Sequence, residues 1–147
     1  MTDTQSKTPT GARPKTTVVL SRTDKGRYEL RNSRGTVIEI ATEGEAFRPG
    51  ELFLASIAAC SAVDVDEMTS RRAEPEIFEV RSSGHKSTEG GNHYEDLTVT
   101  FRLRFADDAD GDAARERVPA AVRASAEHDC TVARTIKLGT PVDFVID

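Results

Sequence analysis

Apolar and polar residues alternate in three short segments near the start of the chain. Residues 16–20, 27–31 and 36–40 are rich in β-branched residues or place apolar residues at every second position, the period of a half-buried strand. The segments between them, residues 23–26 and 32–35, are polar and end in glycine, as tight hairpin turns require. The pattern predicts an antiparallel three-stranded meander.

The next segment has the pattern of a long helix. Pro49 suits the first helical turn, where its missing N–H costs nothing, and Glu51 lies near the positive end of the helix dipole. The helical pattern continues to about Arg72, and residues 52–60 are almost entirely apolar, which predicts burial on several sides. We therefore expect a long central helix that carries Cys60.

Two longer strands should follow this helix. Residues 77–83 and 94–105 favour strands around a polar loop over residues 84–92, and the second strand alternates strictly from Leu97 to Phe105. One face of this hairpin is expected to belong to the core.

The pattern of residues in the last third of the chain predicts a helix, a helical turn and a strand. Residues 112–129 suit an amphipathic helix that Pro119 must either start afresh or kink. Residues 130–137 favour a short helical turn, and residues 141–146 favour a closing strand.

The expected order is β-β-β-α-β-β-α-β, which indicates an α+β fold with an antiparallel sheet. The 147 residues suffice for one domain over residues 16–147, and the Thr, Ser, Pro and Lys content of residues 1–15 predicts a disordered leader. The apolar surface of the helix is larger than one small sheet can cover. We expect a second copy to cover the remainder in a symmetric dimer.

Net charge and hydropathy limit the cellular locations and the classes of partner that we expect for this protein. The formal net charge of -5 gives no reason to bind nucleic acid or anionic lipid. No apolar run approaches the roughly 20 residues that span a bilayer, and the N-terminal segment lacks the apolar core of a signal peptide. We expect a cytoplasmic protein without a nucleic-acid or membrane partner.

The chain has two cysteines, Cys60 and Cys130. A structural disulfide is disfavoured in a reducing compartment, which leaves a redox role or simple burial. Cys60 has apolar neighbours at helical spacing, so its thiol is inert unless a cation or a helix end favours the thiolate. Cys130 precedes a helical segment, whose free N–H groups would favour a thiolate, and His128 is nearby in the sequence.

Other common sites have no support in the sequence. Zinc sites need three or four ligands at recognisable spacing, whereas the cysteines are isolated and the three histidines are scattered at positions 85, 93 and 128. The chain contains no CxxC, GxSxG, P-loop or GxGxxG motif. We expect no metal and no cofactor.

Two segments carry a resemblance to a known family. Residues 49–60, PGELFLASIAAC, resemble the first-cysteine motif of the OsmC/Ohr family, which includes osmotically inducible protein C and the organic hydroperoxide resistance proteins. Residues 125–132, SAEHDCTV, with residues 139–142, GTPV, are similar to the segment that leads from the family's second cysteine into its last strand. With the expected element order, the resemblance covers nearly everything after the leader.

The resemblance implies an intertwined homodimer and a thiol peroxidase of the oxidative stress response. Cys60 would be the peroxidatic cysteine and Cys130 the resolving one, with an organic hydroperoxide as substrate and an external dithiol as reductant. In the hydroperoxide-resistance branch, an arginine from the first hairpin, oriented by a helix-start glutamate, supplies a cation. The matching positions here are Arg22, or less well Arg27, and Glu51.

The sequence departs from the hydroperoxide-resistance branch at three places. Gly50 occupies the position of that branch's glutamate, Ser61 replaces an aromatic residue, and residues 131–132 are Thr-Val where that branch has Pro-Tyr. The chain therefore resembles the broader OsmC-like branch. Three functions stay open: a thiol peroxidase, a non-catalytic thiol sensor or binding protein, and a structural stress dimer whose cysteines only pack.

Overall fold

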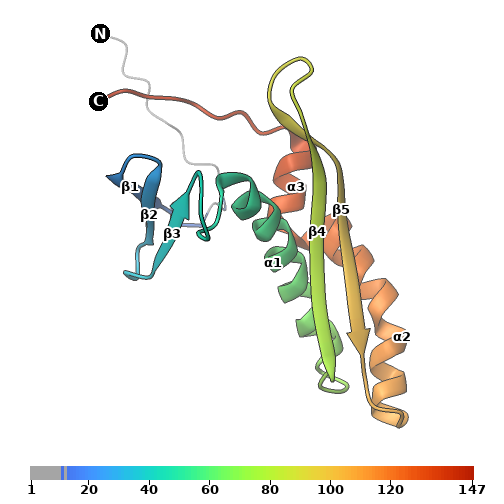
Figure 1. Cartoon of the computed structure of the whole chain (residues 1–147). Coiled ribbons are helices and arrows are strands. Elements are labelled where there is room, and N and C mark those ends of the chain that lie inside the picture. The colour runs from blue at the N-terminus through green and yellow to red at the C-terminus, as the bar shows by residue number, and fades with distance from the viewer. Residues whose placement is uncertain (1–10, 12) are drawn as a thin grey trace. The chain divides into compact units, whose positions relative to one another are not determined.

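The alternating segments near the N-terminus form the predicted antiparallel meander (Figure 1). In this computed structural model, which describes residues 11 and 13–147, the strands are β1 (Val18–Asp24), β2 (Arg27–Asn32) and β3 (Val37–Ala41). Gly26 in the first turn has a φ of 70°, and a Cβ there would lie 2.7 Å from Oγ1 of Thr42. Both facts make glycine the residue that fits this turn.

The chain divides into two compact units, one that extends to Pro49 and one that begins at Gly50. The first unit contains the meander. The leader expected over residues 1–15 lies mostly outside the described residues, and a single domain over residues 16–147 stays a prediction.

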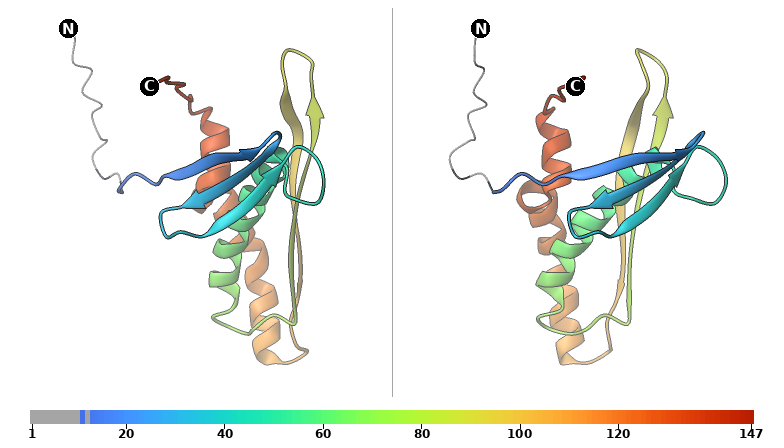
Figure 2. Two further views of the ribbon diagram at one scale, coloured as in Figure 1. Left: turned by 60° about the vertical axis from the view of Figure 1, so that its left-hand side comes forward. Right: turned by 90° about the vertical axis from the view of Figure 1, so that its left-hand side faces the viewer.

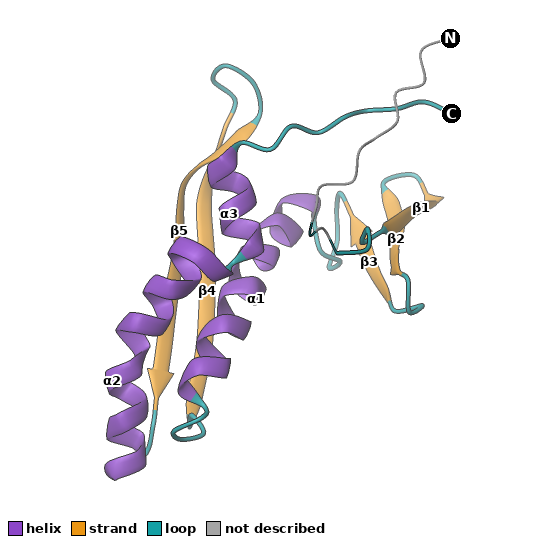
Figure 3. Cartoon of the chain, turned by 180° about the vertical axis from the view of Figure 1, so that it is seen from behind, coloured by secondary structure: helices purple, strands orange, loops and turns teal. Residues whose placement is uncertain are grey.

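The second unit combines one long hairpin with helices. Its elements are α1 (Pro49–Thr69), β4 (Ile77–Ser87), β5 (His93–Arg104), α2 (Ala109–Ala124), a five-residue π turn (Ser125–Asp129) and α3 (Thr131–Leu138). β4 and β5 pair antiparallel, from Ile77 opposite Arg104 to Ser87 opposite His93. The helices lie on one face of the hairpin, as the side views show (Figure 2), and they cover it when the chain is seen from behind (Figure 3).

The core of the second unit lies between these two layers. Every fourth residue of α1 is buried from Ile57 to Thr69, a stripe that faces one direction because four residues are slightly more than one turn. The stripe contains Ser61 and Val65, and Val65 is fully buried. No helix in the described part of the chain has the length and hydrophobicity that a membrane crossing requires.

The helices largely follow the prediction, with different ends. α1 ends at Thr69, three residues before the expected end. α2 begins earlier than expected because the Asp108 side chain accepts a hydrogen bond from the N–H of Gly111 and caps it. The helix passes through Pro119 without being restarted there.

The expected closing strand is wrong for this structure. Residues 139–147 form no strand, although they alternate as a strand would. Phe144 is 94% exposed and Ile146 is 98% exposed. A strand is stable only when a neighbouring strand accepts its hydrogen bonds, and no described strand lies beside this segment. The antiparallel α+β class is confirmed, but the observed order ends in a helix.

Candidate functional site

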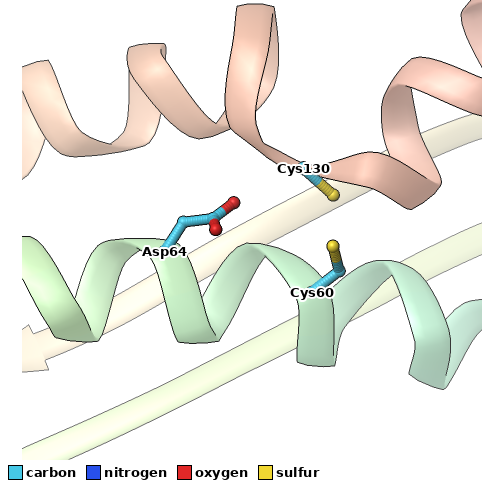
Figure 4. Close-up of side chains that lie close together, drawn as sticks. All are labelled: Cys60, Asp64 and Cys130. Atoms are coloured by element: carbon cyan, nitrogen blue, oxygen red, sulfur yellow. The ribbon is translucent and has the colours of Figure 1, made fainter. Parts of the chain in front are cut away.

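The structure brings the two cysteines together within the second unit. Cys60 lies in the middle of α1 and Cys130 immediately precedes α3, 70 residues later. Their sulfur atoms and a carboxylate oxygen of Asp64 all lie within 4.8 Å of one another (Figure 4). Both thiols are free; Cys60 is partly exposed and Cys130 is fully buried.

Cys130 is placed by the ends of two helical segments. The π turn closes with a hydrogen bond from the Cys130 N–H to the carbonyl of Ser125, 3.0 Å long. The Cys130 side chain then caps α3, because its sulfur accepts the N–H of Ala133 at 3.4 Å. The Ser61 hydroxyl of α1 donates to the same sulfur at 3.5 Å. The Cys130 sulfur therefore faces donors from two elements.

The two thiols have opposite pKa shifts. Burial raises the pKa of the Cys60 thiol, and this effect exceeds that of the Val132 N–H, which lowers it. Burial alone would also raise the pKa of Cys130, but the Ala133 N–H, the Ser61 hydroxyl and the Cys60 thiol hold the pKa of Cys130 below its ordinary value. In the reduced pair the proton is therefore favoured on Cys60 and the negative charge on Cys130.

Asp64 completes the group of side chains. It lies four residues after Cys60 and therefore on the same face of α1. Its Oδ2 accepts a hydrogen bond of 2.7 Å from the hydroxyl of Ser125, which is almost fully buried. The carboxylate is thus held in place beside the sulfur atoms.

An apolar pocket of about 410 Å³ lies beside Cys130, although neither cysteine is among its lining residues. Ser61 and Ala133, which both donate to the Cys130 sulfur, lie in its wall, and Lys137 and Ser125 add further polar atoms. The rest of the wall is mainly apolar and comes from β5 and all three helices: Ile57, Leu97, Val99, Phe101, Val122 and Ile136. The pocket has the apolar character of a small-molecule site.

The other residues expected at the site lie elsewhere in the chain. Arg22 is in β1 and Arg27 is in β2, where Arg27 forms an ion pair with Glu39; both belong to the first unit. Glu51 is in the first turn of α1. It precedes Cys60 by nine residues, about 13 Å along a helix, so any effect of Glu51 on Cys60 must pass through an intervening group.

Gly50 has a structural reason for being glycine. A Cβ at this position would collide with the hydroxyl of Tyr94, whose ring stacks on Phe53 at 5.5 Å. The place where the hydroperoxide-resistance branch has its glutamate is therefore closed to a side chain unless Tyr94 moves. Glu51 is the acidic residue that this chain offers at the helix start.

Sequence reasoning gave no role to three of the residues around the sulfur atoms. Asp64 has a detectable pattern, since it follows Cys60 at helical spacing. Ser61 and Ser125 have none, because their contacts join segments separated by more than 60 residues.

Comparison with known proteins agrees with this architecture. The fold and the site define a small α+β protein with a free dithiol between two helical segments. Residues 42–145 match the family model described as OsmC-like protein, and the chain belongs to this family. The predicted resemblance is confirmed.

Relatives and solved structures cover most of the chain. An uncharacterized protein of Mycobacterium tuberculosis is 28% identical over 129 residues, which are 86% of this chain and 93% of the relative. A crystal structure of a hypothetical protein from Aquifex aeolicus shares the fold with a TM-score of 0.70 and 21% identity, over 87% of this chain and 91% of that one. The organic hydroperoxide resistance protein OhrB of Bacillus subtilis aligns with a TM-score of 0.51 and 20% identity, over 82% and 90% of the two chains.

Proposed function

We propose that the protein is a thiol peroxidase that reduces organic hydroperoxides through a sulfenate–disulfide cycle of Cys60 and Cys130. The observation that carries the proposal is the approach of the two free sulfur atoms to within 4.8 Å, one partly exposed and one buried. Family membership and the fold shared with OhrB support the same chemistry.

The proposed cycle begins with the proton on Cys60. Cys130 accepts this proton, and the Cys60 thiolate attacks the distal oxygen of the hydroperoxide. The O–O bond breaks, the Cys130 thiol gives its proton to the departing alkoxide, which leaves as the alcohol, and Cys60 becomes a sulfenic acid. The Cys130 thiolate then attacks the Cys60 sulfur, and the displaced hydroxide takes a proton from solvent and leaves as water. One thiol, one thiolate, one hydroperoxide and one proton from solvent thus give a disulfide, an alcohol and water.

An external dithiol restores the pair. It reaches the sulfur of Cys60, because Cys130 is fully buried. Cys130 then departs as a thiolate, and a thiol with a lowered pKa leaves faster. The reductive half of the cycle therefore fits the same division of roles. It also requires a reducing compartment, in keeping with the predicted cytoplasmic location.

The apolar pocket supports a substrate with an organic group. Its wall meets the sulfur of Cys130 through Ser61 and Ala133. A hydroperoxide whose organic part occupies the pocket would bring its O–O bond to the dithiol, and burial of that part would favour binding over hydrogen peroxide.

A cation near Cys60 belongs to the proposal as well. Burial raises the pKa of Cys60, so the attacking thiolate needs a positive partner. Arg22 is the residue proposed for this role, with Arg27 as the second choice and Glu51 to orient the guanidinium. The resemblance to the family supports this assignment.

We also propose a homodimer. The meander exposes large apolar side chains, among them Val18 and Leu20, and the C-terminal segment exposes Phe144 and Ile146. A second copy would cover such surfaces. A monomer in sedimentation at micromolar concentration would contradict this assembly.

A redox sensor is the second candidate. The raised pKa of Cys60 favours it, because a thiol that is rarely ionised reacts slowly with peroxide. A sensor would be oxidised once and would then wait for a partner, whereas an enzyme turns over.

Steady-state consumption of cumene hydroperoxide with a dithiol reductant tests the function. The wild type should turn over. Cys60→Ser should show no reaction, and Cys130→Ser should form one sulfenic acid per chain and then stop. Full turnover by both variants would rule out the assignment, and one oxidation without turnover by the wild type would favour the sensor.

A further inference from the structure

We propose that Cys60, Asp64 and Cys130 form a zinc site in the reduced protein. This proposal goes beyond the peroxidase function and does not rest on it, because it concerns the binding of an ion by the same side chains without any oxidation. The sequence predicted no metal site, since it offered two cysteines far apart. The fold places them together and adds a carboxylate.

The distances suit a small tetrahedral ion. The two sulfur atoms and one carboxylate oxygen lie within 4.8 Å of one another. Zinc bonds of about 2.3 Å to sulfur and about 2.1 Å to oxygen would set the ligand atoms roughly 3.5 to 3.8 Å apart. Each pair of atoms therefore needs to close by at most about 1.3 Å, which rotation of the side chains can supply.

The ligands come from two elements that face each other. Cys60 and Asp64 are four residues apart on one face of α1, a spacing that presents two side chains to one ion. Cys130 comes from the opposite side, at the start of α3. The three side chains point toward a common space (Figure 4).

The carboxylate is oriented as a metal ligand would be. The almost fully buried Ser125 hydroxyl donates to Oδ2 of Asp64 at 2.7 Å, which fixes the direction of the carboxylate. Hydrogen bonds to ligating carboxylates of this kind set their direction in known metal sites. This contact is independent of the proximity of the two thiols.

The ligand set selects the ion. Two sulfur ligands disfavour calcium and magnesium, which prefer oxygen, while zinc accepts sulfur and carboxylate together. Three protein ligands leave a fourth position for water. An ion held here would occupy both sulfur atoms, so the metal-bound and peroxide-reactive states of the pair exclude each other.

Cobalt and zinc titrations of the reduced full-length chain test the site, with a non-thiol reductant and without oxygen. Cobalt should bind one ion per chain and give sulfur-to-metal charge-transfer bands with the strong visible bands of a tetrahedral centre. Zinc should displace it, and competition with a chromophoric chelator gives the affinity. Circular dichroism checks that each variant is folded.

Three variants distinguish this site from nonspecific binding of zinc by thiols. Asp64→Asn should weaken zinc binding at least tenfold, and Cys130→Ser should abolish the charge-transfer bands or reduce them to those of one sulfur. Asp66 is an exposed acid on the same helix, and Asp66→Asn should change the zinc affinity less than twofold. Absence of one-to-one binding by the wild type would overturn the proposal. Equal affinities of the wild type and Asp64→Asn would also overturn it, since the two thiols alone would then bind the ion. Peroxide consumption by the metal-free protein is measured separately, so either proposal can fail alone.

Discussion

Cys60 and Cys130 face each other, but they lie at different places on their helices. Cys60 is inside α1, where the N–H groups of its own helix are already bonded and burial raises its pKa. Cys130 is the cap of α3, where the Ala133 N–H is unsatisfied by the helix and donates to its sulfur. Both sulfur atoms accept N–H groups from the first turn of α3, but the Cys130 sulfur also accepts the Ser61 hydroxyl and the Cys60 thiol. The contrast teaches that the number of donors facing each sulfur decides which thiol has the lowered pKa.

The same contrast divides the chemical roles. Cys60 is partly exposed and Cys130 is buried, so we expect peroxide and an external dithiol to react at Cys60. The lowered pKa of Cys130 makes its thiolate the better leaving group. Each proposed role thus depends on a local feature that a substitution can remove.

The largest expected effect is on the titration of the two thiols. Thiolate absorbance at 240 nm in the reduced protein should rise in two steps, one below and one above the ordinary pKa of cysteine, because the pKa of Cys130 is lowered and that of Cys60 is raised. Because the two thiols interact, each titration step describes the pair of thiols and not one thiol alone. Cys130→Ser should lose the lower step. A single step of double height at the ordinary pKa of cysteine would show that the two thiols do not differ in pKa.

A smaller effect is expected from Ser61→Ala. Loss of the hydroxyl that donates to Cys130 should move the lower step to higher pH and slow reduction of the disulfide several-fold, because Cys130 becomes a poorer leaving group. Ser56→Ala is the matched control, since the Ser56 hydroxyl donates to the Phe53 carbonyl within α1. If both variants keep the wild-type titration and reduction rate, Ser61 has no part in stabilising the charge.

The smallest effect concerns stability. Cys130→Ala should be less stable than Cys130→Ser by about 1 kcal/mol, because serine is a good helix cap and alanine is not. At Cys60, inside the helix, the order should reverse by a few tenths of a kcal/mol, since alanine is the better helix former. Urea unfolding of the four variants measures both differences. If alanine were more stable than serine at both positions, the cap at Cys130 would contribute nothing to stability.

The hairpins and helices were predictable because their patterns are local. Alternation located β2 and β3, and the apolar run after Pro49 located α1. The segment 141–146 has a local strand pattern too, but a strand also needs a neighbour, and a pattern within one segment contains no information about its neighbour.

The candidate site was predictable only in part. The pairing of Cys60 with Cys130 came from the family resemblance, because a separation of 70 residues says nothing about proximity. The hydroxyls of Ser61 and Ser125 became visible only when the helices packed together. The roles of Arg22, Arg27 and Glu51 stay predictions.

The most direct test of the central claim is peptide mass spectrometry of the reduced protein after one equivalent of an organic hydroperoxide. The account predicts that the chain loses two hydrogens and that the peptides containing Cys60 and Cys130 are joined by an intramolecular disulfide, which a dithiol then cleaves. Cys130→Ser treated in the same way should instead carry one trapped sulfenic acid on Cys60. Wild-type protein that keeps both thiols free, or that accumulates higher oxides of Cys60 without the disulfide, would contradict the proposed cycle.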